Sequence, residues 1–207
     1  IGPGKGALTN EILNKKPKSL ILIEKDIQLS KNLKEKYKNN KLVQVFCDDI
    51  LDFNLKKINS NKFIIFGNLP YNISSQILIK FIRFNNVAFK FSDLIFMFQK
   101  ELGDKIIGNY PSTNYGRLSI IRNYKFEIIK NFLVSPNCFF PKPKVNSMVI
   151  HFYPKKSNIK IKKITNLEKI TNIFFSNKRK MINKNIRKIL NDKELKKLRI
   201  KINLRPS

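Results

Sequence analysis

The sequence predicts an α/β protein with a mostly parallel, doubly wound sheet, a late antiparallel hairpin and a small helical C-terminal domain. Short apolar runs of strand length alternate with segments of helical apolar spacing over residues 9–98. This alternation is typical of a parallel sheet with crossover helices. After Gly116 two strand-like runs follow without a long helix between them, which indicates an antiparallel hairpin. From Thr165 onward the apolar residues have helical spacing only.

The first half of the chain supplies the parallel strands. Thr9 opens a short helix that Pro17 ends, because proline cannot continue a helix. The apolar run at 19–24 ends in an acid, Glu24, as expected for a strand buried on both faces. The other elements predicted here are a helix over 27–37, strands over 42–46 and 63–67, a helix over 76–84 capped by Ser74 or Ser75, and a strand over 93–98.

The second half supplies the hairpin and the helical domain. Its predicted elements are strands over 126–134 and 147–152 and helices over 166–175, 178–190 and 192–200. A basic segment at 155–163 separates the last strand from the first of these helices. We therefore expect one domain over residues 1–154 and a second over residues 155–207.

Composition excludes several classes of protein. The chain has 42 Lys and Arg against 14 Asp and Glu, a formal net charge of +28, and residues 155–207 are the more basic part. Lysine far outnumbers arginine, as an AT-rich genome would produce, so charge alone favours a nucleic-acid partner only slightly. No apolar run reaches the roughly 18 residues of a membrane span. Two cysteines and one histidine exclude a disulfide framework and most zinc sites.

From these features we expect a cytoplasmic protein without membrane or metal, although an organelle would give the same composition. We also expect it to act as a monomer. The chain begins with Ile1 in a run that resembles the end of a strand entering a glycine-rich turn, and it stops at Ser207 without a helix cap. We therefore expect a fragment that lacks both ends.

Four polar features follow the predicted parallel strands. Ligands of doubly wound sheets bind at the carboxyl ends of the strands. The features there are the turn of Gly2, Gly4 and Gly6, then Glu24, Asp49 and Asn68. The G-x-G-x-G spacing differs from that of dinucleotide sites, and no P-loop Lys-Ser/Thr follows. Both observations argue against NAD and ATP as ligands. The glycines alone are equally consistent with a simple tight turn, but the four features together predict an adenosine-shaped site.

The two acids each have a functional and a structural interpretation. Glu24 can accept both ribose hydroxyl protons through its two oxygens, or it can be a solvated residue at a strand end. Asp49 can accept from an exocyclic adenine amine, or it can cap the turn at Ile50 and Leu51.

The segment Asn68-Leu69-Pro70-Tyr71 is the most specific signal. Methyl transfer to an exocyclic amine requires the nitrogen lone pair to leave conjugation with the ring. An Asn side-chain oxygen and a main-chain carbonyl fixed by proline can hold the two N–H groups while this happens. An aromatic side chain can stack on the base, which contributes about 1–3 kcal/mol. The alternative is an ordinary turn after a strand.

These motifs resemble the KsgA/RsmA family of rRNA adenine N6,N6-dimethyltransferases. The matching stretches run in family order along nearly the whole chain: IGPGKGALT (1–9), LIEKD (22–26), NLPYNIS (68–74), FMFQKE (96–101), YGRLS (115–119), FFPKPKVNS (139–147) and FFSNKRKMINKNI (174–186). The resemblance implies a Rossmann-like methyltransferase domain over 1–154 and a helical rRNA-binding domain over 155–207. It implies S-adenosyl-L-methionine as cofactor. The implied substrate is two adjacent adenines in the 3′-terminal hairpin of small-subunit rRNA, within the pre-30S particle.

The resemblance also implies roles for single residues. Those expected at the cofactor are Gly2, Gly4, Gly6, Glu24, Asp49 and Asn68. Asn68 and the Pro70 carbonyl would hold the target amine, with Tyr71 on the base and Leu69 completing the motif. Phe139 would close over the other face of the adenine, or it is a core residue. Contacts to the rRNA backbone are expected from Lys178, Arg179, Lys180 and Arg187, for which a solvated helix face is the alternative.

Two substitutions depart from the family pattern, and two main rival functions remain beside a weaker third, a DNA adenine methyltransferase, for which nothing in the sequence reads a duplex. Asn146 stands where the family usually has Asp, and Lys178 where it usually has Arg. The first rival is the related Erm group, which methylates large-subunit rRNA and confers macrolide resistance. YGRLS, Leu69 and the basic FFSNKRK segment favour the small-subunit enzyme. The second rival is a non-catalytic RNA-binding assembly or transcription factor of the same fold, against which the intact Asn68-Leu69-Pro70-Tyr71 argues.

Overall fold

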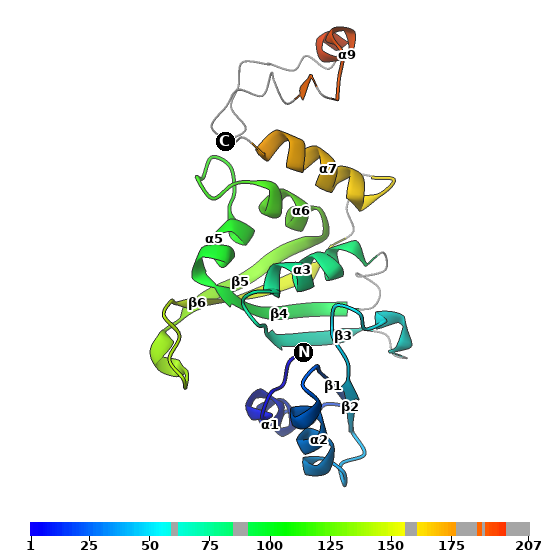
Figure 1. Ribbon diagram of the computed structural model, residues 1–207, viewed down its shortest axis with the longest axis vertical. Helices are drawn as coiled ribbons and strands as arrows, with labels where there is room; N and C mark the ends of the chain where they lie inside the picture. The colour runs from blue at the N-terminus through cyan, green and yellow to red at the C-terminus, as the bar shows by residue number, and fades with distance from the viewer. Residues whose placement is uncertain (59–61, 85–90, 156–160, 177–185, 188, 198–207) are drawn as a thin grey trace. The chain divides into compact units, whose positions relative to one another are not determined.

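A computed structural model describes residues 1–58, 62–84, 91–155, 161–176, 186–187 and 189–197 (Figure 1). The chain divides into two compact units, and each is described by itself. The first unit comprises Ile1–Lys100 and Ile128–Pro154, and the second comprises Glu101–Glu127 and Lys155–Ser207. Residues 101–127 thus group with the C-terminal residues, whereas the domain division at residue 154 stays a prediction.

The first unit contains two sheets. In one, β1 (Leu20–Glu24) pairs in parallel with β2 (Val43–Cys47). In the other the order is β3-β4-β6-β5, with bounds Phe63–Asn68, Phe91–Gln99, Ser147–Pro154 and Phe126–Val134. β3 and β4 are parallel, whereas β4 and β6 are antiparallel. The α/β class, the parallel pairing and the late antiparallel addition are therefore confirmed, but the described strands form two sheets rather than one.

Among the described residues of this unit, one α-helix precedes β1 and two others lie between strands. They are α1 (Ala7–Asn14), α2 (Ile27–Lys36) and α3 (Ser74–Arg83). α2 begins where the Asp26 carboxylate accepts a hydrogen bond from the Leu29 N–H at 2.8 Å, a regular N-cap. α3 lies across one face of β4 and buries Ile77, Leu78 and Phe81 completely (Figure 1). These positions follow the helical spacing that predicted the helix.

The expected serine cap on α3 was wrong. The N-cap residue is Ile73, which offers no side-chain acceptor. The Ser74 hydroxyl instead donates to the Tyr71 carbonyl at 3.0 Å. Ser74 therefore ties the start of α3 to the preceding loop, which follows Asn68.

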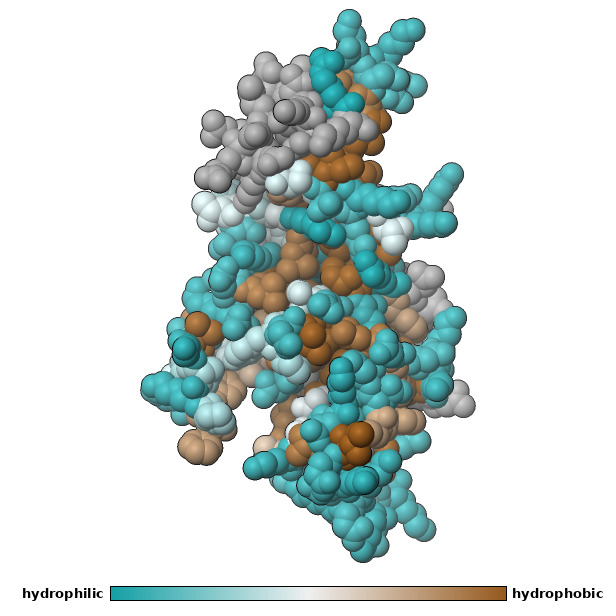
Figure 2. Space-filling model, viewed as in Figure 1, coloured by the Kyte–Doolittle hydropathy of each residue, from teal (hydrophilic) through white to brown (hydrophobic). Residues whose placement is uncertain are grey.

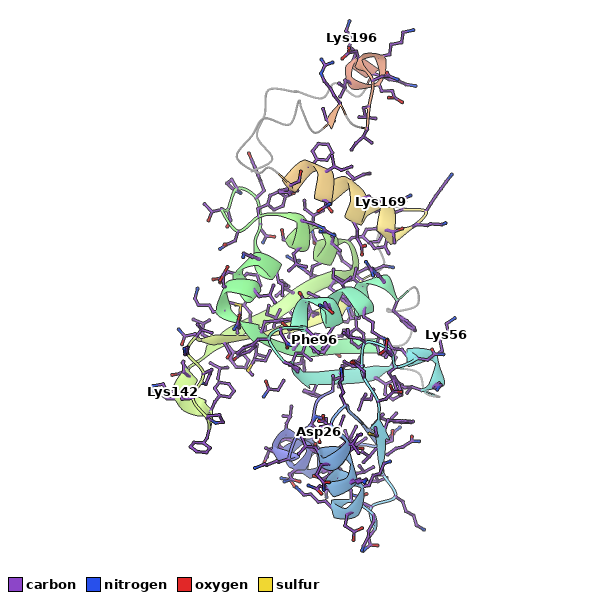
Figure 3. The ribbon with its side chains drawn as sticks, in the orientation of Figure 1. Asp26, Lys56, Phe96, Lys142, Lys169 and Lys196 are labelled. Carbon is purple, nitrogen blue, oxygen red and sulfur yellow. The ribbon has the colours of Figure 1, made fainter. Side chains whose placement is uncertain are left out.

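An aromatic cluster forms the core beneath α3. Phe81 packs against Phe91 and Phe96, with ring centroids 5.5 Å apart in both pairs. Phe98 and Phe152 extend the cluster across β4 and β6. Phe96 lies at its centre (Figure 3). Burial of this apolar surface fixes β4, so the ends of β3 and β4 have a rigid support.

The second unit contains helices that the sequence did not predict. α5 (Lys100–Ile107) and α6 (Arg117–Lys125) lie between the strands predicted over 93–98 and 126–134, where no element was predicted from the sequence. Both are short, and Gly103 lowers the helix propensity of α5. Tertiary contacts stabilise them instead: the buried Arg122 guanidinium donates to the Ile106 carbonyl at 3.0 Å. Burial lowers the pKa of Arg122 to about 10.

The C-terminal helices agree with two of the three predictions. α7 (Ile164–Phe175) and α9 (Asp192–Lys197) correspond to the helices predicted over 166–175 and 192–200. Most of the segment 178–190 lies outside the described residues. α7 packs on α6, with Arg117 donating to Asn172 at 3.2 Å. In the described part of the chain, no helix is long and apolar enough to cross a membrane.

Candidate active site

The carboxyl ends of β1, β2 and β3 are joined by main-chain hydrogen bonds. The Gly2 N–H donates to the Ile23 carbonyl at 3.0 Å, and the Ile1 main-chain nitrogen donates to the Phe66 carbonyl at 2.8 Å. The Asp48 N–H donates to the Glu24 carbonyl at 3.0 Å. The glycine-rich turn therefore bridges the ends of β1 and β3, while β2 ends beside β1.

The turn needs glycine at its three predicted positions. Gly2, Gly4 and Gly6 have φ of 58°, 55° and 83°, in the left-handed region that other residues rarely adopt. A Cβ on Gly2 would lie 3.8 Å from the Asn68 carbonyl oxygen, so the turn reaches the end of β3. A Cβ on Gly4 would meet no atom within 4 Å, which leaves open space above the turn. Gly6 is the N-cap of α1.

Glu24 is buried and holds the turn in place. Its Oε2 accepts from the Gly4 N–H and its Oε1 from the Asp26 N–H, both at 3.0 Å. The exposed fraction of Glu24 is 8%, so the interpretation as a solvated residue is wrong. Each carboxylate oxygen has a second lone pair. The side chain can therefore fix the turn and still accept from a ligand hydroxyl.

Asp49 organises the loop that follows β2. Its Oδ1 accepts from the Leu51 N–H at 2.8 Å, so the structural interpretation of a capped turn is confirmed. Its Oδ2 pairs with the Lys25 ammonium at 2.7 Å. The hydrogen bond from Lys25 lowers the pKa of the Asp49 carboxyl, so the group is ionised at neutral pH. A ligand amine at Asp49 would use the remaining lone pairs of this carboxylate.

The Asn68 motif lies at the end of β3. Asn68 is exposed and Leu69 is buried, so leucine anchors the motif while asparagine faces outward. Among the residues that the structure describes, none forms a hydrogen bond with the Asn68 side chain. The Pro70 carbonyl accepts one bond, from the Ile73 N–H at 3.2 Å, and keeps a second lone pair.

Phe139 comes from the loop between β5 and β6, directly after a 3-10 turn at Pro136–Cys138. It is half-buried and lines a cavity of about 620 Å³ together with Gly2 and Asn68. Most of the cavity wall consists of apolar residues along the facing edges of β1 and β3. The structure therefore brings Phe139, the turn and Asn68 around one cavity, but most of that cavity is an apolar slot between strands.

Two positioning residues were not found from the sequence. The Lys80 ammonium on α3 donates to the carbonyls of Leu51 and Phe53, at 2.7 and 2.8 Å, and so clamps the Asp49 loop. Desolvation lowers the pKa of Lys80. Its only signal in the sequence is a lysine within an apolar helical run. Gly67 is the second: a Cβ there would lie 2.5 Å from Leu69 Cδ2.

The expected rRNA contacts are mostly outside the described residues. Lys178, Arg179 and Lys180 all fall in the segment 177–185 that the structure does not describe. Arg187 is described, and its guanidinium pairs with the Asp192 carboxylate at 2.9 Å. The described residues contain no group of three or more His, Cys, Asp or Glu that could hold a metal ion.

Comparison with known proteins identifies the family of this chain. The family model for ribosomal RNA adenine dimethylase matches residues 1–205. The chain is 46% identical to the ribosomal RNA small subunit methyltransferase A of Pelagibacter ubique, over all of this chain and 79% of that protein. This chain belongs to the ribosomal RNA adenine dimethylase family. A methyltransferase A from Malacoplasma penetrans is 39% identical, over 90% of this chain and 66% of that protein.

Solved structures agree with the family's fold. A dimethyladenosine transferase from Plasmodium falciparum superposes with a TM-score of 0.73 at 26% identity, over 96% of this chain and 68% of that one. The 23S rRNA methyltransferase ErmE superposes with a TM-score of 0.71 at 21% identity, over 99% of this chain and 82% of that one. The second match supports the shared methyltransferase fold alone. The predicted membership of the rRNA adenine dimethyltransferases is therefore confirmed.

Proposed function

We propose that this protein dimethylates N6 of two adjacent adenines in the 3′-terminal hairpin of small-subunit rRNA, with S-adenosyl-L-methionine as methyl donor. The observation that carries the proposal is the end of β3, where an outward-facing Asn68 and the Pro70 carbonyl stand beside the glycine-rich turn. The names of the relatives support the choice of the small subunit. The protein would act in biogenesis of the small subunit, on the pre-30S particle in the cytoplasm, as a monomer.

The residues at the strand ends fit S-adenosyl-L-methionine. The open space above Gly4 leaves room for a ligand against the turn. Glu24 offers acceptors for ribose hydroxyls, and Asp49 offers an acceptor for the adenine amine of the cofactor. Gly2, Gly6 and Asn68 would complete the site. When bound, the cofactor supplies an electrophilic methyl group on its sulfonium.

The chain's own contribution is to hold the target amine. The Asn68 side-chain oxygen and the free lone pair of the Pro70 carbonyl accept its two N–H groups, which favours the pyramidal nitrogen of the transition state. Tyr71 stacks on one face of the adenine and Phe139 closes over the other. The base must first leave its loop, at a cost of a few kcal/mol. Lys178, Arg179, Lys180 and Arg187 would hold the rRNA backbone.

The two rival functions are less well supported. The likeness to ErmE concerns the fold, whereas the relatives at 36–46% identity are named for the small subunit. A non-catalytic RNA-binding factor would not need an amine-holding geometry at Asn68 and Pro70. Neither rival therefore has an observation that favours it.

The test uses the full-length protein with radiolabelled S-adenosyl-L-methionine. Unmethylated small subunits and bare large-subunit rRNA are offered in parallel, and labelled nucleotides are mapped. We expect the label on two adjacent adenines of the small-subunit rRNA. Asn68→Ala should lose this labelling and still bind the rRNA. Label on large-subunit rRNA alone would show that the protein acts as an Erm-type methyltransferase. Binding of small subunits without any label would favour the non-catalytic factor.

A further inference from the structure

The loop between β5 and β6 exposes a phenylalanine completely. Phe140 has a relative exposure of 102%, whereas its neighbour Phe139 is half-buried at the cavity. Burying a phenylalanine side chain contributes about 1.5–3 kcal/mol to folding, so a fully exposed ring contributes none of this. A single exposed apolar residue is common in folded proteins. The basic residues around Phe140 indicate that its ring binds a ligand.

The loop around Phe140 is basic and contains two prolines. Lys142 and Lys144 are exposed on the same loop, and no Asp or Glu occurs anywhere between residues 128 and 167. Pro141 and Pro143 restrict the backbone between them. Figure 2 shows hydrophobic surface at the tip of this loop beside hydrophilic surface, and Lys142 lies on the same loop in Figure 3. An aromatic ring flanked by cations is the surface that binds single-stranded nucleic acid.

The loop is fixed to the candidate active site at its other end. The Asn146 carbonyl accepts from the Lys100 N–H at 2.9 Å. The next residue, Ser147, forms a hydrogen bond with the Tyr71 hydroxyl at 2.6 Å. Phe139, directly before Phe140, lines the cavity with Asn68. Since consecutive Cα atoms are about 3.8 Å apart, Phe140 stands immediately outside the place proposed for the target adenine.

We propose that Phe140, with Lys142 and Lys144, forms a second stacking site, for an unpaired base adjacent to the target nucleotide. Phe140 stacks on the base, and the two lysines bind the neighbouring phosphates. Because the site does not touch the reacting amine, it acts on RNA binding and on the register of the strand. The inference rests on the proposed function, since it takes the target to be an adenine in an RNA loop.

The first experiment measures binding of an unmethylated hairpin from small-subunit rRNA. We expect Phe140→Ala to weaken binding by about 5- to 160-fold, the range for loss of one base stack. Phe140→Tyr keeps the ring and should bind like the wild type. Ile129→Ala shortens an exposed apolar side chain on β5 of the same hairpin and serves as the control. The KM for S-adenosyl-L-methionine should stay unchanged in all three variants.

The second experiment identifies the ligand of Phe140. Hairpins with an abasic site on either side of the target are compared on wild type and Phe140→Ala. One of the two abasic sites should weaken wild-type binding and have little further effect on the variant, because the same stack is already lost. Replacing Lys142 and Lys144 by Gln should lower the salt dependence of binding, by about 1.4 in the logarithmic slope.

The outcomes separate this inference from the proposed function. The stacking site would be overturned if Phe140→Ala bound the hairpin as tightly as the wild type does. It would also be overturned if the two abasic sites weakened binding equally, in the wild type and in the variant alike. A wild-type protein that labels no small-subunit adenine would overturn the proposed function. In that case weaker RNA binding by Phe140→Ala would still support an RNA-binding loop.

Discussion

Tyr71 and Ser147 are 76 residues apart in sequence, yet the Tyr71 hydroxyl and Ser147 Oγ lie 2.6 Å from one another. Ser147 is fully buried at the start of β6, whereas the Tyr71 ring is half-buried. The hydrogen bond therefore fixes the ring at its far end and leaves part of it accessible. It also joins the Asn68 motif to the loop that carries Phe139.

Removing either partner of this bond should lower methyl transfer. In Ser147→Ala the Tyr71 ring loses its tether, and in Tyr71→Phe the buried Ser147 hydroxyl loses its partner, at about 1 kcal/mol in each case. Since both changes remove the same bond, the double variant should be much less impaired than the sum. Measuring kcat/KM for the four proteins gives the interaction energy, expected at about 0.5–3 kcal/mol. Additive losses would mean that the bond does not orient the ring.

A methyl group at Gly67 should disturb the end of β3, which carries Asn68. The Cβ of Gly67→Ala would lie 2.5 Å from Leu69 Cδ2 and 3.1 Å from Phe96 Cδ1. Because Leu69 and Phe96 are buried, we expect a loss of about 1–3 kcal/mol in the free energy of unfolding and a lower kcat. Gly116→Ala is the control: its Cβ would meet Phe175 at 3.9 Å, an ordinary contact. Denaturant unfolding of both variants checks the prediction, and equal stabilities would refute it.

The sequence predicted the strand ends better than the contacts between them. Periodicity located β1 to β4, and the rule that ligands bind at strand ends brought the turn, Glu24 and Asn68 together correctly. The sequence could not show that both Glu24 oxygens already accept from main-chain N–H groups, because these bonds depend on the backbone conformation of the turn. The link from Tyr71 to Ser147 was equally hidden, since side-chain pairs distant in sequence leave no periodic signal.

Two helices of the second unit also could not be predicted from the sequence. α5 and α6 are held by tertiary contacts such as that of Arg122 with Ile106, rather than by strong local propensity. Their apolar residues are too few for helical spacing to stand out from a strand pattern. The roles proposed for the site residues remain predictions, because they depend on ligands and on an RNA rather than on the fold.

Lys80 should control cofactor affinity without touching the cofactor. Its ammonium holds the carbonyls of Leu51 and Phe53, on the loop whose shape Asp49 sets. Lys80→Met leaves two carbonyls unpaired, so we expect a loss of about 2–4 kcal/mol in stability. The loosened loop should raise the KM for S-adenosyl-L-methionine about 10-fold or more, for a loss of roughly 1.4 kcal/mol in binding.

The pattern of kinetic effects distinguishes loop positioning from general damage to the fold. At saturating cofactor the kcat of Lys80→Met should stay close to wild type, because the end of β3 does not depend on this lysine. Lys80→Arg keeps a cation and should recover part of the affinity. Lys56→Met is the matched control, since Lys56 is exposed on the 3-10 turn Leu55–Lys57 of the same region (Figure 3). Equal falls in kcat and affinity for Lys80→Met, or an equal effect of Lys56→Met, would show that Lys80 does not act through the Asp49 loop.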